Sequence, residues 1–280
     1  MLGEAIIARS LGQCRIRDKF GNRWQYHSRS DRHSKIACWA ILFDILQSSS
    51  LLKAHVETGK VGFGVNHEMH DFRQNRKKNL DLVLCSGKAL EGTHVSFASY
   101  GRKIGIELDA VGETELSKLP TVYSGRKSNV LIALEAKACM TEHTKAQPRL
   151  YDELASSFQT IHGDTNRAVA AAFVMINCAD SFVSPDRNRK RIRGGRVVIN
   201  THRQPDAAAK VLEKVMKLLR RSDERESGFD AVGVTMVRCC NDRSPITIDE
   251  TANASLPKIV SYGEFIHRLT HLYATKFAAI

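Results

Sequence analysis

The 280-residue sequence lacks any run of 18 apolar residues and any cleavable apolar leader. These absences argue against a membrane-spanning helix and against secretion. The sequence also lacks the paired CxxC spacing of a zinc ribbon, because its seven cysteines are odd in number and scattered along the chain. Several of them lie inside apolar runs, where cysteine packs as a small hydrophobic residue. We therefore expect a reduced, cytoplasmic protein that does not associate with a membrane.

Motifs of several enzyme classes are absent as well. No P-loop, Gly-x-Ser-x-Gly elbow or dinucleotide-binding glycine pattern occurs, which argues against a nucleotide-driven motor, an α/β hydrolase and a dehydrogenase. Acidic residues are few: 30 Asp and Glu stand against 42 Lys and Arg, giving a net charge of +12 and a pI near 9.5. This excess favours nucleic acid as the partner, although solubility or a structural partner would also account for it.

What the sequence does contain is an unusual strand at the start of residues 129–153. Val130 to Leu134 form an unbroken apolar run, which predicts a strand buried on both faces and hence a central member of a sheet. Glu135 and Lys137 follow, and the alternation of side chains along a strand places both on one face. Because an unpaired buried charge is costly, the pair is either a catalytic element or a structural ion pair at a strand end.

A second carboxylate would complete a metal site here. A carboxylate on a strand can bind Mg²⁺ through oxygen, and a lysine beside it can position an attacking water or stabilise the charge of a phosphoryl group. Asp81 stands directly before the apolar run Leu82 to Leu84, which predicts another short buried strand. Asp109, in the segment KIGIELDAVG, is the alternative partner. We favour Asp81 because of the apolar run behind it.

Asp81 followed by Glu135-Ala136-Lys137 resembles the PD-(D/E)xK, or restriction-endonuclease-like, nuclease superfamily, and the resemblance covers about residues 31–178. It implies an α/β fold, a three-layer sandwich with a central mixed β-sheet flanked by helices. It also implies Mg²⁺, for which Mn²⁺ can substitute, held by Asp81, Glu135 and the backbone carbonyl of Ala136. Lys137 would position or activate the water that attacks phosphorus.

The chain departs from the family pattern in two places. Leu80 stands where the family has a proline before the first acid, and the interval from Asp81 to Glu135 is long, so an insertion must be assumed. Gln147 and Tyr151 resemble a QxxxY element that follows the lysine in one branch of the superfamily, which makes Gln147 a further candidate site residue. That branch has Asp where this chain has Glu135.

Two other acids and a set of basic residues complete the predicted site. Glu57, at the end of a predicted helix, and Glu68, in the sequence HEMH, are further candidate members. HEMH lacks the i, i+4 histidine pair of HExxH and does not support zinc protease chemistry. Basic residues that could hold DNA phosphates lie before Asp81, after Lys137 and in a basic loop. They are Arg73, Arg76, Lys77, Lys78, Lys145, Arg149, Arg187, Arg189, Lys190, Arg191 and Arg193.

We expect one domain over residues 1–280, with a basic N-terminal arm at 1–30 and the basic loop at 181–205. In the arm, Trp24 and Tyr26 could stack on a base or sugar, and a mobile solvated arm is the alternative interpretation. Apolar periodicity predicts helices beginning near residues 31, 51, 141, 206 and 261, the last with a capping box. Strands are predicted at 60–66, 168–179 and 231–240, and a hairpin excursion between 87 and 112.

The sequence thus predicts a Mg²⁺-dependent endodeoxyribonuclease that hydrolyses phosphodiester bonds of double-stranded DNA. The resemblance implies a Type II restriction enzyme acting as a homodimer and leaving a 3′ hydroxyl and a 5′ phosphate. Two other hypotheses stay open. One is a non-catalytic DNA-binding protein that kept the fold and the charge, and the other is a repair or junction nuclease of the same fold.

Overall fold

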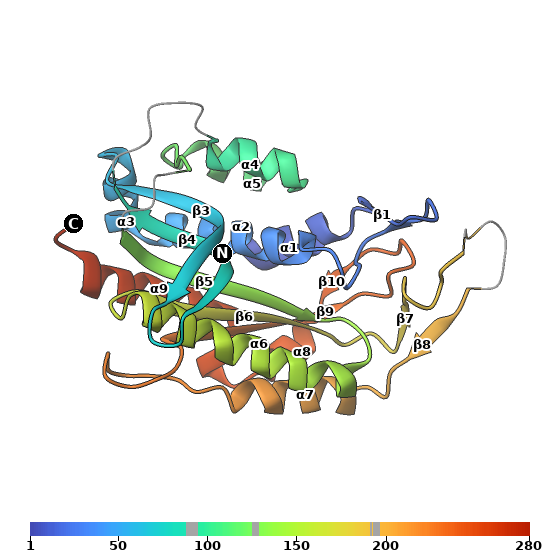
Figure 1. The fold of residues 1–280 in the computed structure, drawn as a ribbon. Coiled ribbons are helices and arrows are strands. Elements are labelled where there is room, and N and C mark those ends of the chain that lie inside the picture. The colour runs from blue at the N-terminus through green and yellow to red at the C-terminus, as the bar shows by residue number, and fades with distance from the viewer. Residues whose placement is uncertain (88–94, 125–128, 191, 193–196) are drawn as a thin grey trace.

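The structure is a computed structural model that describes residues 1–87, 95–124, 129–190, 192 and 197–280. Its centre is a six-stranded mixed sheet (Figure 1). Strands β3, β4 and β5 are antiparallel neighbours, whereas β5, β6 and β9 run parallel. The predicted α/β fold with a mixed central sheet is confirmed. Across the sheet the order is β10 (Thr247–Ile248), β9 (Ala231–Arg238), β6 (Val169–Asn177), β5 (Asn129–Cys139), β4 (Arg76–Ser86) and β3 (Val61–Asp71).

Helices pack on both faces of this sheet and form a separate apolar core with each face. The first core contains side chains of α1 (Gly3–Leu11), α2 (Arg32–Ser48) and α9 (Tyr262–Phe277). The second contains side chains of α6 (His143–Asp164) and α7 (Asp206–Met216). In Figure 1, α6 and α7 lie below the sheet, and α1, α2 and α4 lie above it.

Short elements connect these layers. They are β1 (Ile16–Arg17), β2 (Arg23–Trp24), α3 (Ser50–Glu57), α4 (Phe97–Ile104), α5 (Ala110–Ser117), β7 (Ser181–Val183), β8 (Ile199–Thr201), α8 (Glu250–Ala254) and the 3₁₀ helix η1 (Lys258–Val260). Of the helices in the described ranges, none is by itself long and apolar enough to cross a membrane. Only α2 and α3 taken together, across a bend of 99°, reach that length and composition.

β5 and β6 lie in the middle of the sheet because their sequences are apolar on both faces. All nine residues of β6 are buried. In β5, Leu134 and Ala136 face the core that contains α2, whereas Ala133 and Cys139 face the core that contains α6. The predicted strands at 130–134 and 168–179 are confirmed, and β5 continues past the apolar run to Cys139.

The predicted hairpin excursion between residues 87 and 112 is wrong in its described part, where the chain forms α4 and α5. Ser96 caps α4 by accepting a hydrogen bond from the backbone N–H of Ser99. α4 also packs closely on α2, since a Cβ atom on Gly101 would lie 2.7 Å from Trp39 Nε1. Capping and this close approach outweigh the strand-like alternation of apolar residues in the segment.

The N-terminal 30 residues do not form a free basic arm. Ile6 and Leu11 of α1 are buried in the core that contains α2. Trp24 and Tyr26, predicted to stack on a base or sugar, are buried too, and Trp24 Nε1 donates a hydrogen bond to Asp18. The buried apolar side chains of this segment therefore belong to the fold, whereas its arginines and lysines are exposed.

The remaining predicted helices and the predicted strands at 60–66 and 231–240 are confirmed, with two changes of detail. β3 is longer than the predicted strand at 60–66, because the HEMH segment continues it to Asp71. Ser261 stands at the N-cap of α9, but its side chain makes no capping hydrogen bond, so the predicted capping box with Glu264 does not form.

A buried carboxylate, Asp44 in the middle of α2, joins three helices. Its side chain is 0% exposed and accepts hydrogen bonds of 2.9 Å from the backbone N–H groups of Leu2 and Gly3 and from the hydroxyl of Tyr262. The N-terminal end of α1 adds its partial positive charge. Because a buried carboxylate is tolerated only when it is paired in this way, Asp44 fixes α1 and α9 against α2.

We expect Asp44→Ala to lower the free energy of unfolding by about 3 kcal/mol, because it leaves buried donors without an acceptor. Urea unfolding followed by circular dichroism measures this change. Asp44→Asn keeps the size of the side chain and one hydrogen-bond acceptor, so its free energy of unfolding should fall by less than that of Asp44→Ala. A loss below about 0.5 kcal/mol in Asp44→Ala, the usual range of a surface substitution, would contradict the prediction.

Candidate active site

Two neighbouring strands bring Asp81 beside Glu135. The pairing of β4 with β5 ends at Leu82 and Leu134. Asp81 and Glu135 are the next residues along the two strands beyond this pair. Asp81 Oδ2 accepts a hydrogen bond of 2.9 Å from the backbone N–H of Ala136. The structure thus brings together the acid on β4 and the Glu-x-Lys segment on β5, which the sequence predicted to form one site.

Both oxygens of Asp81 are oriented by hydrogen bonds. Besides the bond from Ala136, Oδ1 accepts one of 2.9 Å from the hydroxyl of Ser34 in the first turn of α2. Each carboxylate oxygen has a second lone pair, so both can still bind a cation. The group of Ala136 that contacts Asp81 is its N–H, and the role of its carbonyl as a metal ligand stays a prediction.

Glu135 is a buried carboxylate that is satisfied on one oxygen only. It is 2% exposed. Its Oε1 lies 2.7 Å from Lys137 Nζ and 3.7 Å from Lys78 Nζ. Among the residues that the structure describes, Oε2 has no hydrogen-bond partner, although it is fully buried. A buried acceptor without a partner is costly, so this oxygen has unused capacity for a ligand.

α6 supplies the opposite wall of the cluster through Glu153. Glu153 Oε2 lies 3.2 Å from Lys137 Nζ, and Glu153 Oε1 lies 2.6 Å from Arg149 Nε. Lys137 is therefore held between two carboxylates, one on β5 and one on α6. Sequence reasoning missed Glu153, and the available signal was its position three residues after Leu150, at the edge of the buried face of α6.

Lys78 plays a part that the sequence did not reveal. It was predicted to bind DNA phosphate, but its Nζ donates to the backbone carbonyl of Glu153 at 2.6 Å and to the hydroxyls of Ser156 and Ser157. It also lies 3.7 Å from Glu135 Oε1. Lys78 therefore neutralises the interior of the site and attaches β4 to α6. The prediction for Lys78 as a phosphate contact is wrong.

The two acids of the site are both difficult to ionise. Burial raises the pKa of Asp81, although the Ala136 N–H, the charge of Lys137 and the Ser34 hydroxyl oppose the shift. Burial raises the pKa of Glu135 as well, and the nearby charge of Asp81 adds to the shift against the opposing charges of Lys137 and Lys78. A divalent cation bound beside both carboxylates would relieve the effect of Asp81 on the charge of Glu135.

The pKa of Lys137 is shifted upwards. Burial lowers it, but the adjacent charge of Glu135, its hydrogen bond and the charge of Glu153 outweigh burial and raise it. Lys137 is thus an ammonium group at neutral pH. In this state it can donate hydrogen bonds and stabilise negative charge, but it cannot accept a proton.

A cavity of about 620 Å³ reaches Asp81 and Lys137. Besides Asp81 of β4, its lining comes from residues 26–34, from the end of β5 and the N-terminal half of α6 with the turn between them, and from residues 184–187. Glu135 lies behind this surface and is not among the lining residues. Besides Lys137, four lysine and arginine side chains line the cavity: Arg29, Lys145, Arg149 and Arg187. A phosphodiester placed beside Asp81 would therefore be surrounded by positive charge.

The residues present fit a hard divalent cation in part. No three His, Cys, Asp or Glu side chains within the described part of the chain are grouped so that they could hold a metal ion by themselves. Mg²⁺ needs fewer, because it keeps several waters and is bound through one or two carboxylates. Asp81 with its free lone pairs and Glu135 with its unpartnered Oε2 supply that number.

The other candidate acids lie elsewhere. Asp109, the alternative to Asp81, caps α5 and pairs with Arg9 at 2.7 Å. Glu57 is exposed at the end of α3, next to the opposite end of β4 from Asp81. Glu68 is exposed on β3 and pairs with Lys77 at 2.9 Å. None of these three acids lines the cavity or makes a described contact with Asp81, Glu135 or Lys137, so the structure does not bring them together with the site.

The QxxxY element faces away from the cavity. Tyr151 lies against α7, with Lys214 Nζ 4.5 Å from the centre of its ring. Gln147 is one helical turn earlier on the same face of α6 and is half-buried. Gln147 does not line the cavity, so its position does not support its assignment as a site residue.

The other predicted DNA contacts lie in different parts of the structure. Lys145, Arg149 and Arg187 line the cavity, and Arg189 lines an adjoining one. Lys190 is exposed in the segment after β7. Arg73, Arg76 and Lys77 lie at the far end of the β3–β4 hairpin, where Arg76 pairs with Asp71 at 3.3 Å. Arg191 and Arg193 lie outside the described residues.

The site is defined by its geometry and not by similarity to a known protein. Comparison of the chain with known protein families, with curated proteins and with solved structures gives no match. What the structure contributes is a buried pair of carboxylates on adjacent strands, a lysine beside them and a cavity lined with basic side chains.

We expect Asp81→Asn to stabilise the metal-free protein at neutral pH while abolishing its response to Mg²⁺. The folded pKa of Asp81 is raised, so the ionised form weakens the fold once the pH exceeds that pKa, and asparagine removes this cost. The gain should be on the order of 1 kcal/mol near pH 7 and should vanish as the pH falls towards about 3.9, the ordinary pKa of aspartate. Thermal unfolding over a pH series, with and without Mg²⁺, measures both effects.

Asp109→Asn is the matched control. The hydrogen bonds from Gly112 and Arg9 lower the pKa of Asp109, so its charge favours the fold and its removal should give no gain in thermal stability. The prediction for Asp81 is wrong if Asp81→Asn and Asp109→Asn shift the unfolding midpoint in the same direction at neutral pH.

Proposed function

We propose that the protein is a Mg²⁺-dependent endodeoxyribonuclease of the PD-(D/E)xK superfamily that hydrolyses phosphodiester bonds in double-stranded DNA. The observation that carries the proposal is the contact between Asp81 and the backbone of Glu135-Ala136-Lys137, beside a buried Glu135 oxygen that has no partner among the described residues. Carboxylates from two adjacent strands and a lysine two residues after the second acid are the elements of that site.

The order of elements supports the same family. A helix, α2, is followed after α3 by the antiparallel strands β3, β4 and β5, then by α6 and by β6 parallel to β5. The acid lies on the second of the three antiparallel strands and the Glu-x-Lys segment on the third. The long interval between the two active-site strands, for which the resemblance required an insertion, contains α4 and α5.

The residues of the site have distinct roles in this reaction. Asp81, Glu135 and the Ala136 carbonyl would hold Mg²⁺, which supplies Lewis-acid polarisation of the phosphate and of a water when it is bound. Lys137, as an ammonium, donates a hydrogen bond to the attacking water or to a phosphate oxygen and stabilises negative charge there. Glu153 holds Lys137 at the mouth of the cavity through their 3.2 Å contact.

The basic side chains around the cavity hold the substrate. Arg29, Lys145 and Arg187 approach from the N-terminal loop, from α6 and from the segment after β7. Contacts from three directions fix the position of a phosphodiester and add affinity that does not depend on base sequence. We propose that the substrate is duplex DNA and that the enzyme is of the Type II restriction kind and acts as a homodimer.

A second candidate function is a DNA-binding protein without nuclease activity. The observation that favours it is the Lys137–Glu135 contact of 2.7 Å, which is also what a structural ion pair at a strand end would show. A repair or junction nuclease of the same fold would share the site and differ only in substrate. Cleavage assays with different DNA substrates separate these alternatives.

Wild-type protein should cleave unmodified DNA of high sequence complexity in the presence of Mg²⁺, and Lys137→Ala should be at least about 100-fold slower. Cleavage is followed by gel electrophoresis, and sequencing of the fragment ends gives the position of the cut. Lys258→Ala, which removes an exposed charge from η1, should cleave like the wild type. Equal cleavage by wild type and Lys137→Ala removes the assignment, and salt-sensitive binding without any metal-dependent cleavage favours the non-catalytic alternative.

Mg²⁺ affinity should rise with pH across the titration of the two acids. Both carboxylates must be ionised to hold the cation, and burial raises the pKa of each, so protons compete with Mg²⁺ above the ordinary range of a carboxyl group. Titration calorimetry from about pH 5 to pH 8 measures the trend. Glu135→Gln should weaken the affinity throughout. An affinity that does not change over this range would contradict the proposed ligands.

A further inference from the structure

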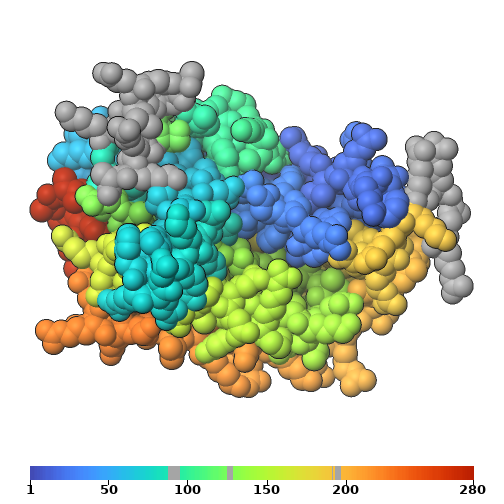
Figure 2. Space-filling view, viewed as in Figure 1, coloured from blue at the N-terminus to red at the C-terminus, as the bar shows by residue number. Residues whose placement is uncertain are grey.

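Two basic segments that are far apart in the sequence meet beside the candidate active site. One is residues 16–30, which contains the β1–β2 hairpin, and the other is residues 184–190, which follows β7; together we call them the basic clamp. Asn22 connects them directly. Its Nδ2 donates to the backbone carbonyl of Lys190 at 2.9 Å, and its Oδ1 accepts from the backbone N–H of Ile192 at 3.0 Å. Figure 2 shows the N-terminal segment in blue lying against the yellow segment after β7.

Asn22 is built into the clamp on both sides. It is 9% exposed, and besides its contacts across the clamp its backbone N–H and its Nδ2 both donate to Asp18, at 2.9 Å each. Asp18 also accepts from the backbone N–H of Phe20 and from Trp24 Nε1. The single amide of Asn22 therefore closes the β1–β2 hairpin and joins it to the other segment.

The acidic side chains of the clamp are used within it. Burial raises the pKa of Asp18, but its hydrogen bonds from Trp24 and Asn22 outweigh burial and lower it, so Asp18 is ionised and fully engaged. Asp186 accepts from the Ser28 hydroxyl at 2.8 Å and lies 3.7 Å from Arg29. These carboxylates line the cavity of the clamp, and their hydrogen bonds and ion pairs join parts of the clamp to one another.

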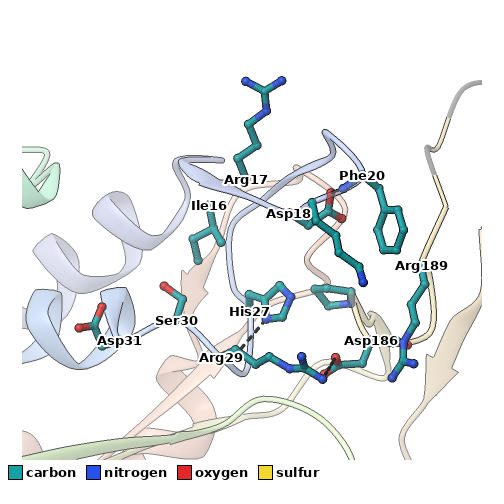
Figure 3. Close-up of a pocket in the computed structure, with 12 residues that line it drawn as sticks. Ile16, Arg17, Asp18, Phe20, His27, Arg29, Ser30, Asp31, Asp186 and Arg189 are labelled. Atoms are coloured by element: carbon teal, nitrogen blue, oxygen red, sulfur yellow. Dashed lines mark hydrogen bonds and ion pairs between the residues drawn. The ribbon is translucent and has the colours of Figure 1, made fainter.

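Its basic side chains are left facing outwards. Arg17, Lys19 and Arg189 line a cavity of about 560 Å³, and none of the three forms an ion pair with an acid of the described ranges. Phe20 lies across this cavity from Arg189 (Figure 3), with Lys19 Nζ 5.2 Å from the centre of its ring. Positive side chains with an aromatic ring between them suit a sugar–phosphate strand, because the charges meet phosphates and the ring meets sugars.

The cavity of the clamp adjoins the cavity of the candidate active site. Residues 29–31 and Asp186 line both. A third cavity, of about 380 Å³, shares Glu142 and Lys145 with the active-site cavity and is also lined by Lys210. The candidate active site thus lies between two further hollows, and a strand bound in it would pass into the clamp.

We propose that the basic clamp binds the sugar–phosphate backbone of duplex DNA on one side of the scissile phosphate, and that Asn22 is the positioning residue that keeps its two segments together. This inference rests on the proposed function, because it takes the substrate to be DNA. It adds a substrate-binding surface outside the catalytic cluster and predicts that binding depends on residues 16–30 as much as on the segment after β7.

The clamp is tested by DNA binding without cleavage. Arg17→Ala/Lys19→Ala is titrated with fluorescent duplex DNA in EDTA over a salt series, against Lys103→Ala/Lys258→Ala, which removes the same charge from exposed residues of α4 and η1. The clamp variant should lose about 10-fold or more in affinity at low salt. The slope of log affinity against log salt should become less steep by about 1.8, which corresponds to two lost phosphate contacts. Equal affinity and slope in the two double variants overturn the proposal, and so does tighter binding of duplex RNA than of duplex DNA.

The positioning role of Asn22 is tested in the cleavage assay. Asn22→Ala changes no charge, so it should raise the KM for DNA about 10-fold while kcat at saturating DNA stays within about twofold of the wild type. Lys137→Ala should lower kcat. Circular dichroism at the assay temperature confirms that Asn22→Ala is folded, and a folded variant with an unchanged KM overturns the role of Asn22.

The two proposals fail in different ways. A wild type that binds duplex DNA through the clamp but never cleaves it removes the proposed nuclease function and leaves the clamp. A wild type that cleaves DNA while the clamp variant binds like its control removes the clamp and leaves the function.

Discussion

The structure around the candidate site depends on one constraint, the burial of the Glu135 carboxylate in the middle of the sheet. Two ammonium groups approach one of its oxygens, and within the described residues the other has no hydrogen-bond partner. An ion pair kept only for stability would be expected to satisfy both oxygens, since an unpaired buried acceptor costs about 1–3 kcal/mol. It would also avoid a second carboxylate nearby, yet Asp81 lies beside it and raises its pKa further. This imbalance is the physical reason to regard the cluster as a ligand site.

The sheet explains why the charges converge at this point. β5 is antiparallel to β4 and parallel to β6, so Asp81 reaches it from one side while the chain leaving β5 must return over the sheet as α6. That return places Glu153 against Lys137. The segments 26–34 and 184–187 then close the remaining sides of the cavity. Four parts of the chain meet at the end of one strand, and each contributes a charged or polar group.

Prediction from the sequence succeeded for the elements that consist of long apolar runs. β5, β6 and α2 are buried on most sides, so their composition alone identified them, and an acid at the end of one run could be matched with Glu135 on another. Prediction from the sequence failed where the structure depends on tertiary pairing of side chains or on helix capping. α4 and α5 replaced a predicted hairpin because Ser96 and Asp109 cap helices there. The apolar residues of α1 lie in a segment rich in arginine, and the sequence analysis therefore assigned them to a basic arm.

The net charge of +12 hides two kinds of basic residue that composition cannot separate. Lys78 and Lys137 are turned inwards, where they balance Glu135 and Glu153, and their charges belong to the fold and the site. Lys19 and Arg189 are turned outwards, because Asp18 and Asp186 beside them are occupied by hydrogen bonds within the clamp. The second kind contributes most directly to the field that an approaching polyanion meets. Whether a basic side chain is of the first or the second kind depends on the strand or loop that it faces. Tertiary contacts such as those of Asn22 decide this placement, and apolar periodicity along the chain does not reveal them.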